Sequence, residues 1–248
     1  MALSFFLQLL LGHVIGDFFL QPYWLVLAKR NGWPGLIIHV GVVTFITSVL
    51  VWGLIPIWWV WMIVLYLGHL FIDQFRTFIF TDNSKGKGLL LLFLDQLAHI
   101  ILIGLIAWGA TGWIFSDLNP LTTEAVNQAR LIVYLIGLTI AVSVVPVLEA
   151  ETTVAVLAFL GTEINYTVAI ETADRMLGAG ERIIAVIVIL LGYWFIAPVI
   201  FLPRLIYMIR QGQFETDKVG VITKVATSFV AMLVVALILL NIPIPALA

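Results

Sequence analysis

Histidine and aspartate recur four residues apart inside apolar stretches of this sequence. The pairs are His13 with Asp17, His69 with Asp73, and Asp95 with His99. Residues four apart lie on one face of a helix, one turn from each other. Each pair therefore presents an imidazole beside a carboxylate, and this mixture of nitrogen and oxygen ligands is typical of Zn, Mn or Fe sites. The chain has no cysteine, so thiolate ligands and thiolate nucleophiles are excluded.

The composition indicates which elements carry these pairs. Of the 248 residues, 62% are hydrophobic and only 10% are charged, whereas about 25% of the residues of a soluble domain are charged. The mean hydropathy is +1.15, and apolar runs recur along the whole chain. We therefore expect an all-α, polytopic integral membrane protein. The formal net charge of −2 gives no basic surface for nucleic acid, and we expect no such partner.

A helix needs about 20 apolar residues to cross a bilayer, and seven segments meet this requirement. They are Leu3–Gln21, Pro34–Pro56, Ile57–Phe80, Leu89–Ala110, Leu131–Leu148, Ile183–Met208 and Val221–Asn241. Residues 1–110 are predicted to form a four-helix core that carries the histidines and aspartates, and residues 111–248 to form C-terminal membrane helices. Near 149–181 an acidic segment surrounds the short apolar stretch from Thr152 to Gly161, which predicts a re-entrant or interfacial element.

The depth of the ionisable residues favours a shared site. On an up-and-down path through the first four helices, His39 and the three pairs all fall toward the same side of the membrane. One ionisable side chain at the bilayer centre costs about 2.5–3.5 kcal/mol, and a divalent cation would offset this cost by binding carboxylates and neutral imidazoles. We therefore expect a metal site whose ligands are His13, Asp17, His39, His69, Asp73, Asp95 and His99.

Residue type suggests functional roles within this set. Asp17, Asp73 and Asp95 are the candidate catalytic carboxylates, any of which could serve as a general base instead of a ligand. Gln21, Gln74 and Gln96 are candidates for amides that support the ligands, or for hydrogen bonds between helices. Two alternatives to a metal site remain, namely histidine–aspartate packing between helices and a relay for protons or cations.

Lysine and arginine favour the cytoplasmic side of a membrane, which predicts an orientation. Five of them lie in or near the breaks after the first and third helices, namely Lys29, Arg30, Arg76, Lys85 and Lys87. The N-terminus is then outside, and the site lies toward the cytoplasm. Seven crossings would leave three basic residues outside, namely Arg204, Arg210 and Lys218. This conflict predicts an eighth crossing within the acidic segment.

The motifs also resemble a known family. The run HVIGDFFLQ from His13 to Gln21, the lone His39, HLFID from His69 to Asp73 and DQLAH from Asp95 to His99 are similar to a family of prokaryotic multi-pass membrane proteins catalogued as domain of unknown function 3307. The resemblance covers roughly the first 110 residues, and Gly180-Glu181-Arg182 is similar to a later element of that family. It implies location in a prokaryotic cytoplasmic membrane and supports the site, but implies no reaction.

Two classes of function fit these residues. The first is a metal-dependent hydrolase acting on a lipid or lipid-linked phosphate that enters from the surrounding membrane lipids, since a bound ion would generate a nucleophile near neutral pH. The sequence lacks a serine nucleophile motif, a phosphate-binding glycine loop and a dinucleotide fingerprint. The second is a transporter for a divalent cation or for protons, which the repeated hairpin with HxxxD followed by histidine also suits. An assembly or scaffold protein is a third possibility.

Overall fold

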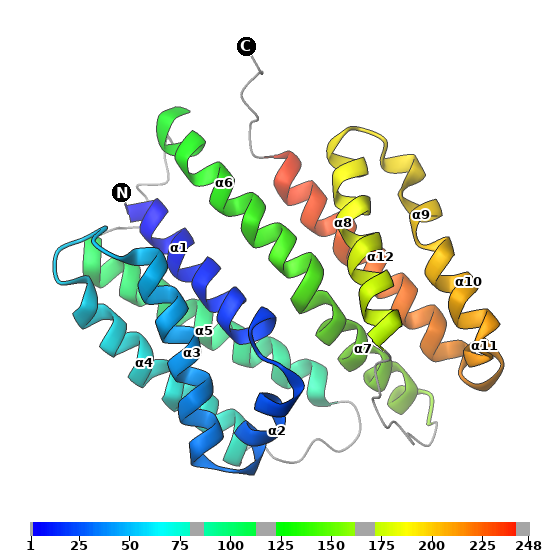
Figure 1. Ribbon diagram of the computed structural model, residues 1–248, viewed down its shortest axis with the longest axis horizontal. Coiled ribbons are helices and arrows are strands. Elements are labelled where there is room, and N and C mark those ends of the chain that lie inside the picture. Colours follow the sequence, from blue (N-terminus) through cyan, green and yellow to red (C-terminus); the bar gives the residue numbers. More distant parts are fainter. Residues whose placement is uncertain (1, 80–86, 113–122, 162–171, 242–248) are drawn as a thin grey trace. The chain divides into compact units, whose positions relative to one another are not determined.

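The computed structural model describes residues 2–79, 87–112, 123–161 and 172–241, and these residues form helices and turns without a strand (Figure 1). Six helical stretches are long and apolar enough to cross a membrane: Ala2–Phe19, Trp33–Val51, Trp58–Phe78, Lys87–Thr111, Ala129–Phe159 and Lys218–Leu240. The prediction of an all-helical chain with repeated apolar spans is confirmed. The described residues supply six of the seven or eight predicted crossings.

The N-terminal helices follow the predicted segments closely. Helix α1 (Ala2–Val14) continues into a π-helical turn, η1 (Ile15–Phe19), and the short α2 (Tyr23–Asn31) precedes α3 (Trp33–Val51). Helix α4 (Trp58–Gln74) also ends in a π-helical turn, η2 (Phe75–Ile79), and α5 spans Lys87–Thr111. Gly32, with a φ of +151°, separates α2 from α3 at the predicted break.

The C-terminal helices differ from the prediction in two places. Helix α6 (Thr123–Thr139), the π-helical turn η5 (Ile140–Val144) and α7 (Val145–Phe159) are continuous. The predicted span Leu131–Leu148 and the stretch after Thr152 therefore belong to one long helix, and no separate re-entrant element begins at Glu149. The rest of the acidic segment includes residues 162–171, which lie outside the described residues, and the start of α8 (Thr172–Leu190).

The predicted single crossing Ile183–Met208 is wrong as one helix. Helix α8 ends at Leu190, and the chain turns back through η6 (Trp194–Ile196), α9 (Ala197–Ile200) and α10 (Leu202–Arg210). The positive φ of Gly192 and the prolines early in α9 and α10 explain the break, because proline cannot donate the hydrogen bond of a helix interior. Helices α9 and α10 pack against α8, so this region is a helical hairpin. The short α11 (Gln213–Thr216) then leads into α12 (Lys218–Leu240).

The chain forms two compact units. One comprises residues 1–82 and 91–136, and the other comprises residues 83–90 and 137–244. The first unit holds most of the predicted four-helix core, and its packing positions the site. In the second, α12 packs against α7 and α8.

Helices α1, α3, α4 and α5 share one apolar core in the first unit. Its buried members are Phe5, Leu9, Val51, Ile55, Met62, Leu65, Ile103, Ile106 and Ala107. Beyond this core, glycines bring η1 and α1 against α3. A Cβ atom at Gly16 would lie 2.6 Å from Val43 Cα, and one at Gly12 would lie 2.7 Å from Thr47 Cα. Only glycine permits this approach, which places Asp17 next to the helix that carries His39.

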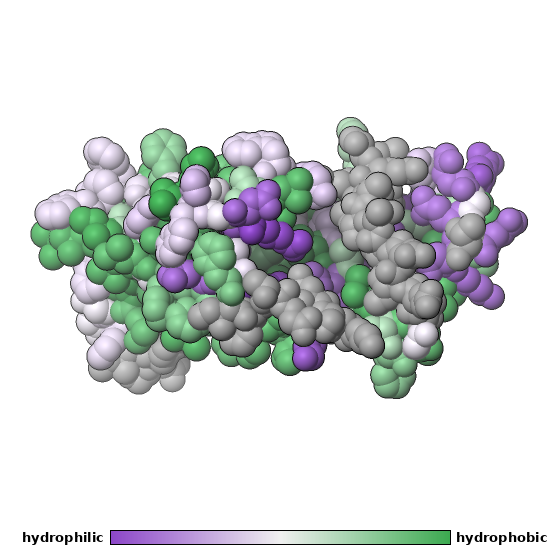
Figure 2. Space-filling view, turned by 90° about the horizontal axis from the view of Figure 1, so that it is seen from below, coloured by the Kyte–Doolittle hydropathy of each residue, from purple (hydrophilic) through white to green (hydrophobic). Residues whose placement is uncertain are grey.

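Large apolar side chains are exposed along the candidate spans. Phe45 on α3, Phe71 on α4 and Trp108 on α5 are each more than half exposed, and Figure 2 shows hydrophobic residues at the surface over much of the visible face. Soluble monomers rarely expose apolar surface on this scale. The outward faces of the helices are therefore suited to contact with lipid.

Candidate metal centre

The first unit brings together all the histidines and aspartates predicted for the site. Helix α1 supplies His13, η1 supplies Asp17, α3 supplies His39, α4 supplies His69 and Asp73, and α5 supplies Asp95 and His99. All except Asp95 are buried, and the Asp95 side chain keeps 11% of its exposure. The convergence of four helices on one cluster is the geometry that the spacing and depth of these residues predicted.

Four donor atoms meet at the middle of the cluster. Nε2 of His39 lies 3.0 Å from Oδ1 of Asp17 and 3.2 Å from Oδ2 of Asp73. Nε2 of His69 lies 3.9 Å and 3.5 Å from the same two oxygens. We call these atoms the four-donor set: two imidazole nitrogens and two carboxylate oxygens from η1, α3 and α4.

Within this set, Asp17, His39 and His69 each offer a ligand atom within 4.8 Å of the others, a group that could hold a divalent metal ion. Bonds of about 2.0–2.1 Å from Zn to nitrogen or oxygen place the ligand atoms of a tetrahedral site about 3.3–3.4 Å apart, and the separations of 3.0–3.9 Å lie around that value. Within the described part of the chain, both ring nitrogens of His69 and Oδ1 of Asp73 are buried without a hydrogen-bond partner. Buried polar atoms are nearly always paired, so a cation would satisfy what the protein leaves open.

His99 carries a further lone pair toward this set. Its Nδ1 lies 2.9 Å from the main-chain oxygen of Asp95 and must donate, because a carbonyl oxygen only accepts. Nε2 is then the unprotonated nitrogen, and it lies 3.9 Å from Oδ1 of Asp73. This orientation through the far ring nitrogen is common among metal-binding histidines. His69, Asp73 and His99 thus form a second group of potential ligands that overlaps the first.

The two contacts of His39 with Asp17 and Asp73, at 3.0 and 3.2 Å, are closer than any of the three predicted pairs within helices, of which His69 with Asp73 is the closest at 3.5 Å. His13 Nε2 and Asp17 Oδ2 are 4.0 Å apart, and His99 Nδ1 and Asp95 Oδ2 are 3.9 Å apart. Two of the three predicted pairs therefore lie apart, and His39, which has no partner on its own helix, lies closest to the carboxylates. The widened turn η1 contributes, because Asp17 lies within it and a π-helical turn changes the direction of the side chains that it carries.

Gln96 connects the remaining members of the cluster. Its Nε2 donates to Oδ2 of Asp17 at 3.1 Å and to Oδ2 of Asp95 at 3.2 Å, and its Oε1 lies 3.2 Å from Nε2 of His13. An amide oxygen only accepts, so His13 donates to Gln96 through Nε2. His13 therefore holds Gln96, and Nε2 of His13 is not placed as a ligand. Gln96 thus hydrogen-bonds from α5 to α1 and η1, as both of the roles predicted for it require.

The other two glutamines differ from each other. Gln21 Nε2 lies 3.2 Å from Nδ1 of His39. A metal at Nε2 of His39 requires a proton on Nδ1, which the Gln21 side chain would accept through its oxygen after a half-turn of the amide. Gln74 is half-buried, and its side chain makes no hydrogen bond within the described part of the chain. Its predicted supporting role therefore has no contact in the structure.

Lys29 belongs to the cluster although the sequence did not single it out as a site residue. It lies on α2, and its Nζ is 2.8 Å from Oδ2 of Asp73. Burial by itself lowers the pKa of Lys29, but the charges of Asp73 and then Asp17 offset this effect and raise the pKa above its ordinary value. The ammonium group is therefore charged at neutral pH. No helical spacing links position 29 to the histidine pairs, so sequence spacing gave no signal for it.

The comparison with known families concerns this first unit. Residues 5–129 match the family described as protein of unknown function, DUF3307. This chain belongs to the DUF3307 family. The match covers every histidine and aspartate of the cluster, as well as Lys29 and all three glutamines. No curated protein and no solved structure matches the chain.

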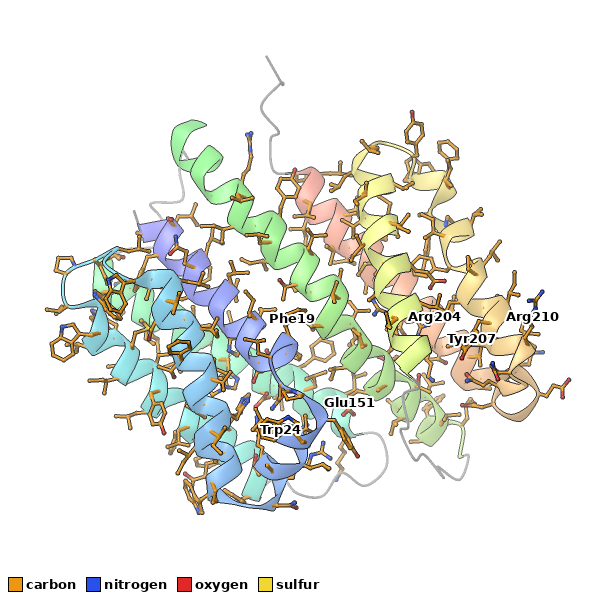
Figure 3. The ribbon with its side chains drawn as sticks, in the orientation of Figure 1. Phe19, Trp24, Glu151, Arg204, Tyr207 and Arg210 are labelled. Carbon is orange, nitrogen blue, oxygen red and sulfur yellow. The ribbon has the colours of Figure 1, made fainter. Side chains whose placement is uncertain are left out.

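A second buried cluster lies beyond the DUF3307 match, in the other unit. Arg182 NH1 donates to Oε1 of Glu149 at 2.8 Å, and Arg204 NH2 donates to Oε2 of Glu149 at 2.9 Å. Ser228 also hydrogen-bonds to Glu149. Figure 3 shows Arg204 between α10 and α8, whereas Arg210 points outward. Glu149 therefore links α7 to α8, α10 and α12, and Arg204 does not extend to lipid headgroups.

Proposed function

We propose that this DUF3307 protein is a metal-dependent membrane hydrolase that acts on a lipid or lipid-linked phosphate. The observation that carries the proposal is the four-donor set, in which two imidazoles and two carboxylates lie at metal-site separations and Nε2 of His69 lacks a hydrogen-bond partner. Zn, Mn or Fe suits two imidazoles and two carboxylates. A bound divalent ion would supply a water-derived nucleophile near neutral pH.

The contacts divide the predicted catalytic aspartates into two roles. Asp17 and Asp73 belong to the four-donor set and are proposed as ligands together with His39 and His69. Asp95 lies outside that set, keeps some exposure and accepts a hydrogen bond from Gln96. Its other oxygen is buried without a hydrogen-bond partner. Asp95 is therefore the proposed general base, which would take the proton of the attacking water.

The position of α2 supports a substrate that comes from the membrane surface. Tyr23 and Trp24 at its start are well exposed, as aromatic residues are at the boundary between lipid and water. On the same helix, Leu25 is buried and Lys29 reaches Asp73. Helix α2 thus joins an exposed aromatic end to the cluster, and an anionic headgroup at the interface would lie near both.

The proposed location is a prokaryotic cytoplasmic membrane, with the N-terminus outside and the cluster toward the cytoplasm. Five crossings, ending with Ala129–Phe159, bring the chain inside. The α8–α10 hairpin begins and ends on one side whether or not it crosses fully, so Arg210 and Lys218 are then cytoplasmic. Counting both arms of the hairpin gives eight crossings. This path agrees with the preference of basic residues for the cytoplasmic side, which a path of seven crossings does not.

Orientation can be tested directly because the chain has no cysteine. Single cysteines at the exposed positions Arg30, Pro56, Tyr193 and Gln211 would be labelled with a membrane-impermeant maleimide on intact cells. Cysteines at Pro56 and Tyr193 should react, and those at Arg30 and Gln211 should react only after permeabilisation. Labelling of Gln211→Cys in intact cells would contradict the proposed path.

Metal content and phosphate release test the function itself. Protein purified in mild detergent without chelators should carry Zn, Mn or Fe by mass spectrometry, whereas Asp17→Asn and Asp73→Asn should lose it while remaining folded. Metal-loaded protein should release phosphate from a panel of lipid phosphates. The Asp95→Asn variant should keep the metal and lose the activity. Wild-type protein that stays free of metal after metal is added would refute the proposal.

A transporter for a divalent cation or protons is the competing proposal, and the pairing of Lys29 with Asp73 favours it. An ammonium group that pairs with a ligand carboxylate could alternate with a transported cation at the same oxygen. Reconstituted vesicles loaded with a zinc-sensitive dye would distinguish the two functions. Zinc flux without phosphate release indicates transport, and phosphate release without flux indicates hydrolysis.

A further inference from the structure

The number of ions at the centre can be inferred from three observations. The first concerns His69, which the two potential ligand groups share: Asp17, His39 and His69 form one group, and His69, Asp73 and His99 form the other. An imidazole nitrogen has one lone pair and binds one ion. If His69 serves the four-donor set through Nε2, the second position keeps only Asp73 and His99.

The second observation concerns the oxygen that a second ion would need. Oδ2 of Asp73 already lies 2.8 Å from Nζ of Lys29, 3.2 Å from Nε2 of His39 and 3.5 Å from Nε2 of His69. In two-metal hydrolases the ions are about 3.5–4 Å apart and clamp the phosphate between them. Here an ammonium group lies beside the carboxylate that a second ion would share with the first.

The third observation is the charge of the cluster. In formal charge, Asp17, Asp73 and Asp95 contribute three negative charges, and Lys29 contributes one positive charge. One divalent ion brings the total to zero. Two divalent ions would leave an excess of two positive charges in a site whose ligands are buried, and unbalanced buried charge is costly.

We propose that the centre holds a single divalent ion and that Lys29 takes the place of the second, pairing with Asp73 in the free protein and binding an anionic oxygen of the phosphate in the substrate complex. This inference rests on the metal centre proposed above. The Lys29 side chain keeps 15% of its exposure, so its ammonium group lies at the edge of the cluster, where a headgroup would arrive.

The chemistry of the lysine side chain suits this role. The ammonium group is a compact charge on a flexible stem, so it can turn from Asp73 to a phosphate oxygen without movement of α2. Helix α2 itself packs against α3 and η2. Arg30, the next residue, is exposed and makes no ion pair within the described residues, so it offers a matched control on the same helix.

The test uses the full-length protein in detergent and three variants: Lys29→Met, Lys29→Arg and Arg30→Met. Bound metal is counted by mass spectrometry, zinc affinity is measured by competition with a chelator, and inorganic phosphate binding to the zinc-loaded protein is measured by calorimetry. Wild type should bind one ion per chain. Lys29→Met should bind zinc at least about tenfold more tightly, because a like charge near the ion is removed, and bind phosphate at least about tenfold more weakly.

In Lys29→Met, zinc affinity should rise while phosphate affinity falls. A residue that only supports the fold would instead weaken both affinities when it is replaced. Lys29→Arg should keep phosphate binding within a few fold of wild type, and Arg30→Met should change neither affinity. Two ions per wild-type chain, or unchanged phosphate affinity in Lys29→Met, would overturn the inference while leaving the metal centre in place. A wild-type protein that binds no metal would instead refute the metal centre, and this inference with it.

Discussion

Removing the charge of Asp73 tests the electrostatics of the cluster most directly. Asp73 is fully buried, and its Oδ2 contacts Lys29 at 2.8 Å. Replacing one partner of a buried ion pair costs about 3–5 kcal/mol, because the other charge is left without compensation. Lys29 keeps 15% exposure and can turn partly toward water, so we expect the lower end of that range, about 3 kcal/mol, for Asp73→Asn in metal-free protein.

The assay is unfolding in mixed micelles by titration with sodium dodecyl sulfate, followed by tryptophan fluorescence, with a chelator present throughout. A double-mutant cycle isolates the pair. Lys29→Met removes the stranded ammonium group, so Asp73→Asn combined with Lys29→Met should recover about 1–2 kcal/mol of the loss. The reasoning would be refuted if Asp73→Asn cost less than about 1 kcal/mol, or if the double variant were no more stable than Asp73→Asn alone.

Three further changes have expected outcomes. Gly16→Ala should destabilise the protein by about 1–3 kcal/mol in the same titration, since its Cβ would lie 2.6 Å from Val43 Cα, whereas Gly41→Ala meets nothing within 4 Å and should be neutral. Glu149→Gln should lower the free energy of unfolding by about 3–5 kcal/mol, because it removes the carboxylate that pairs with Arg182 and Arg204. Glu151→Gln is the control, and an equal loss of stability in the two variants would contradict the importance of the Glu149 network. Asp95→Asn should lower kcat by about 10²–10⁴-fold at unchanged metal content; loss of the metal would make Asp95 a ligand instead.

The convergence of the N-terminal histidines and aspartates could be predicted from the sequence because helical spacing is a local property. A separation of four residues determines which side chains share a helix face. Short loops make successive helices run in opposite directions, which determines how deep each residue lies along the bundle. The convergence of His13, His69 and Asp95 on one level could therefore be predicted before any contact was known. The relative importance of the members could not. His39 has no partner on its own helix, yet its Nε2 lies 3.0 Å from Asp17 and 3.2 Å from Asp73.

The features that escaped prediction depend on contacts between distant segments. Lys29 pairs with Asp73, which lies 44 positions later in the sequence. In the sequence, Lys29 indicated only which side of the membrane the break after the first helix faces. Glu149, Arg182 and Arg204 meet through the turn between α8 and α9, which the apolar run from Ile183 to Met208 concealed. Hydropathy averages over such a run and does not register that Gly192 and two prolines divide it.

The widened turn at η1 constrains how this sequence can change in length. A π-helical turn accommodates one residue more than an α-helical turn, and Asp17 lies inside it. Deleting one residue of the turn, such as Phe18, would let the backbone close into regular α-helical geometry and change the direction in which the side chain of Asp17 leaves the helix. The 3.0 Å approach of Asp17 Oδ1 to Nε2 of His39 would then not be kept. In an apolar helix where most of the apolar residues are interchangeable, the number of residues in this turn is therefore under tighter constraint than their identity.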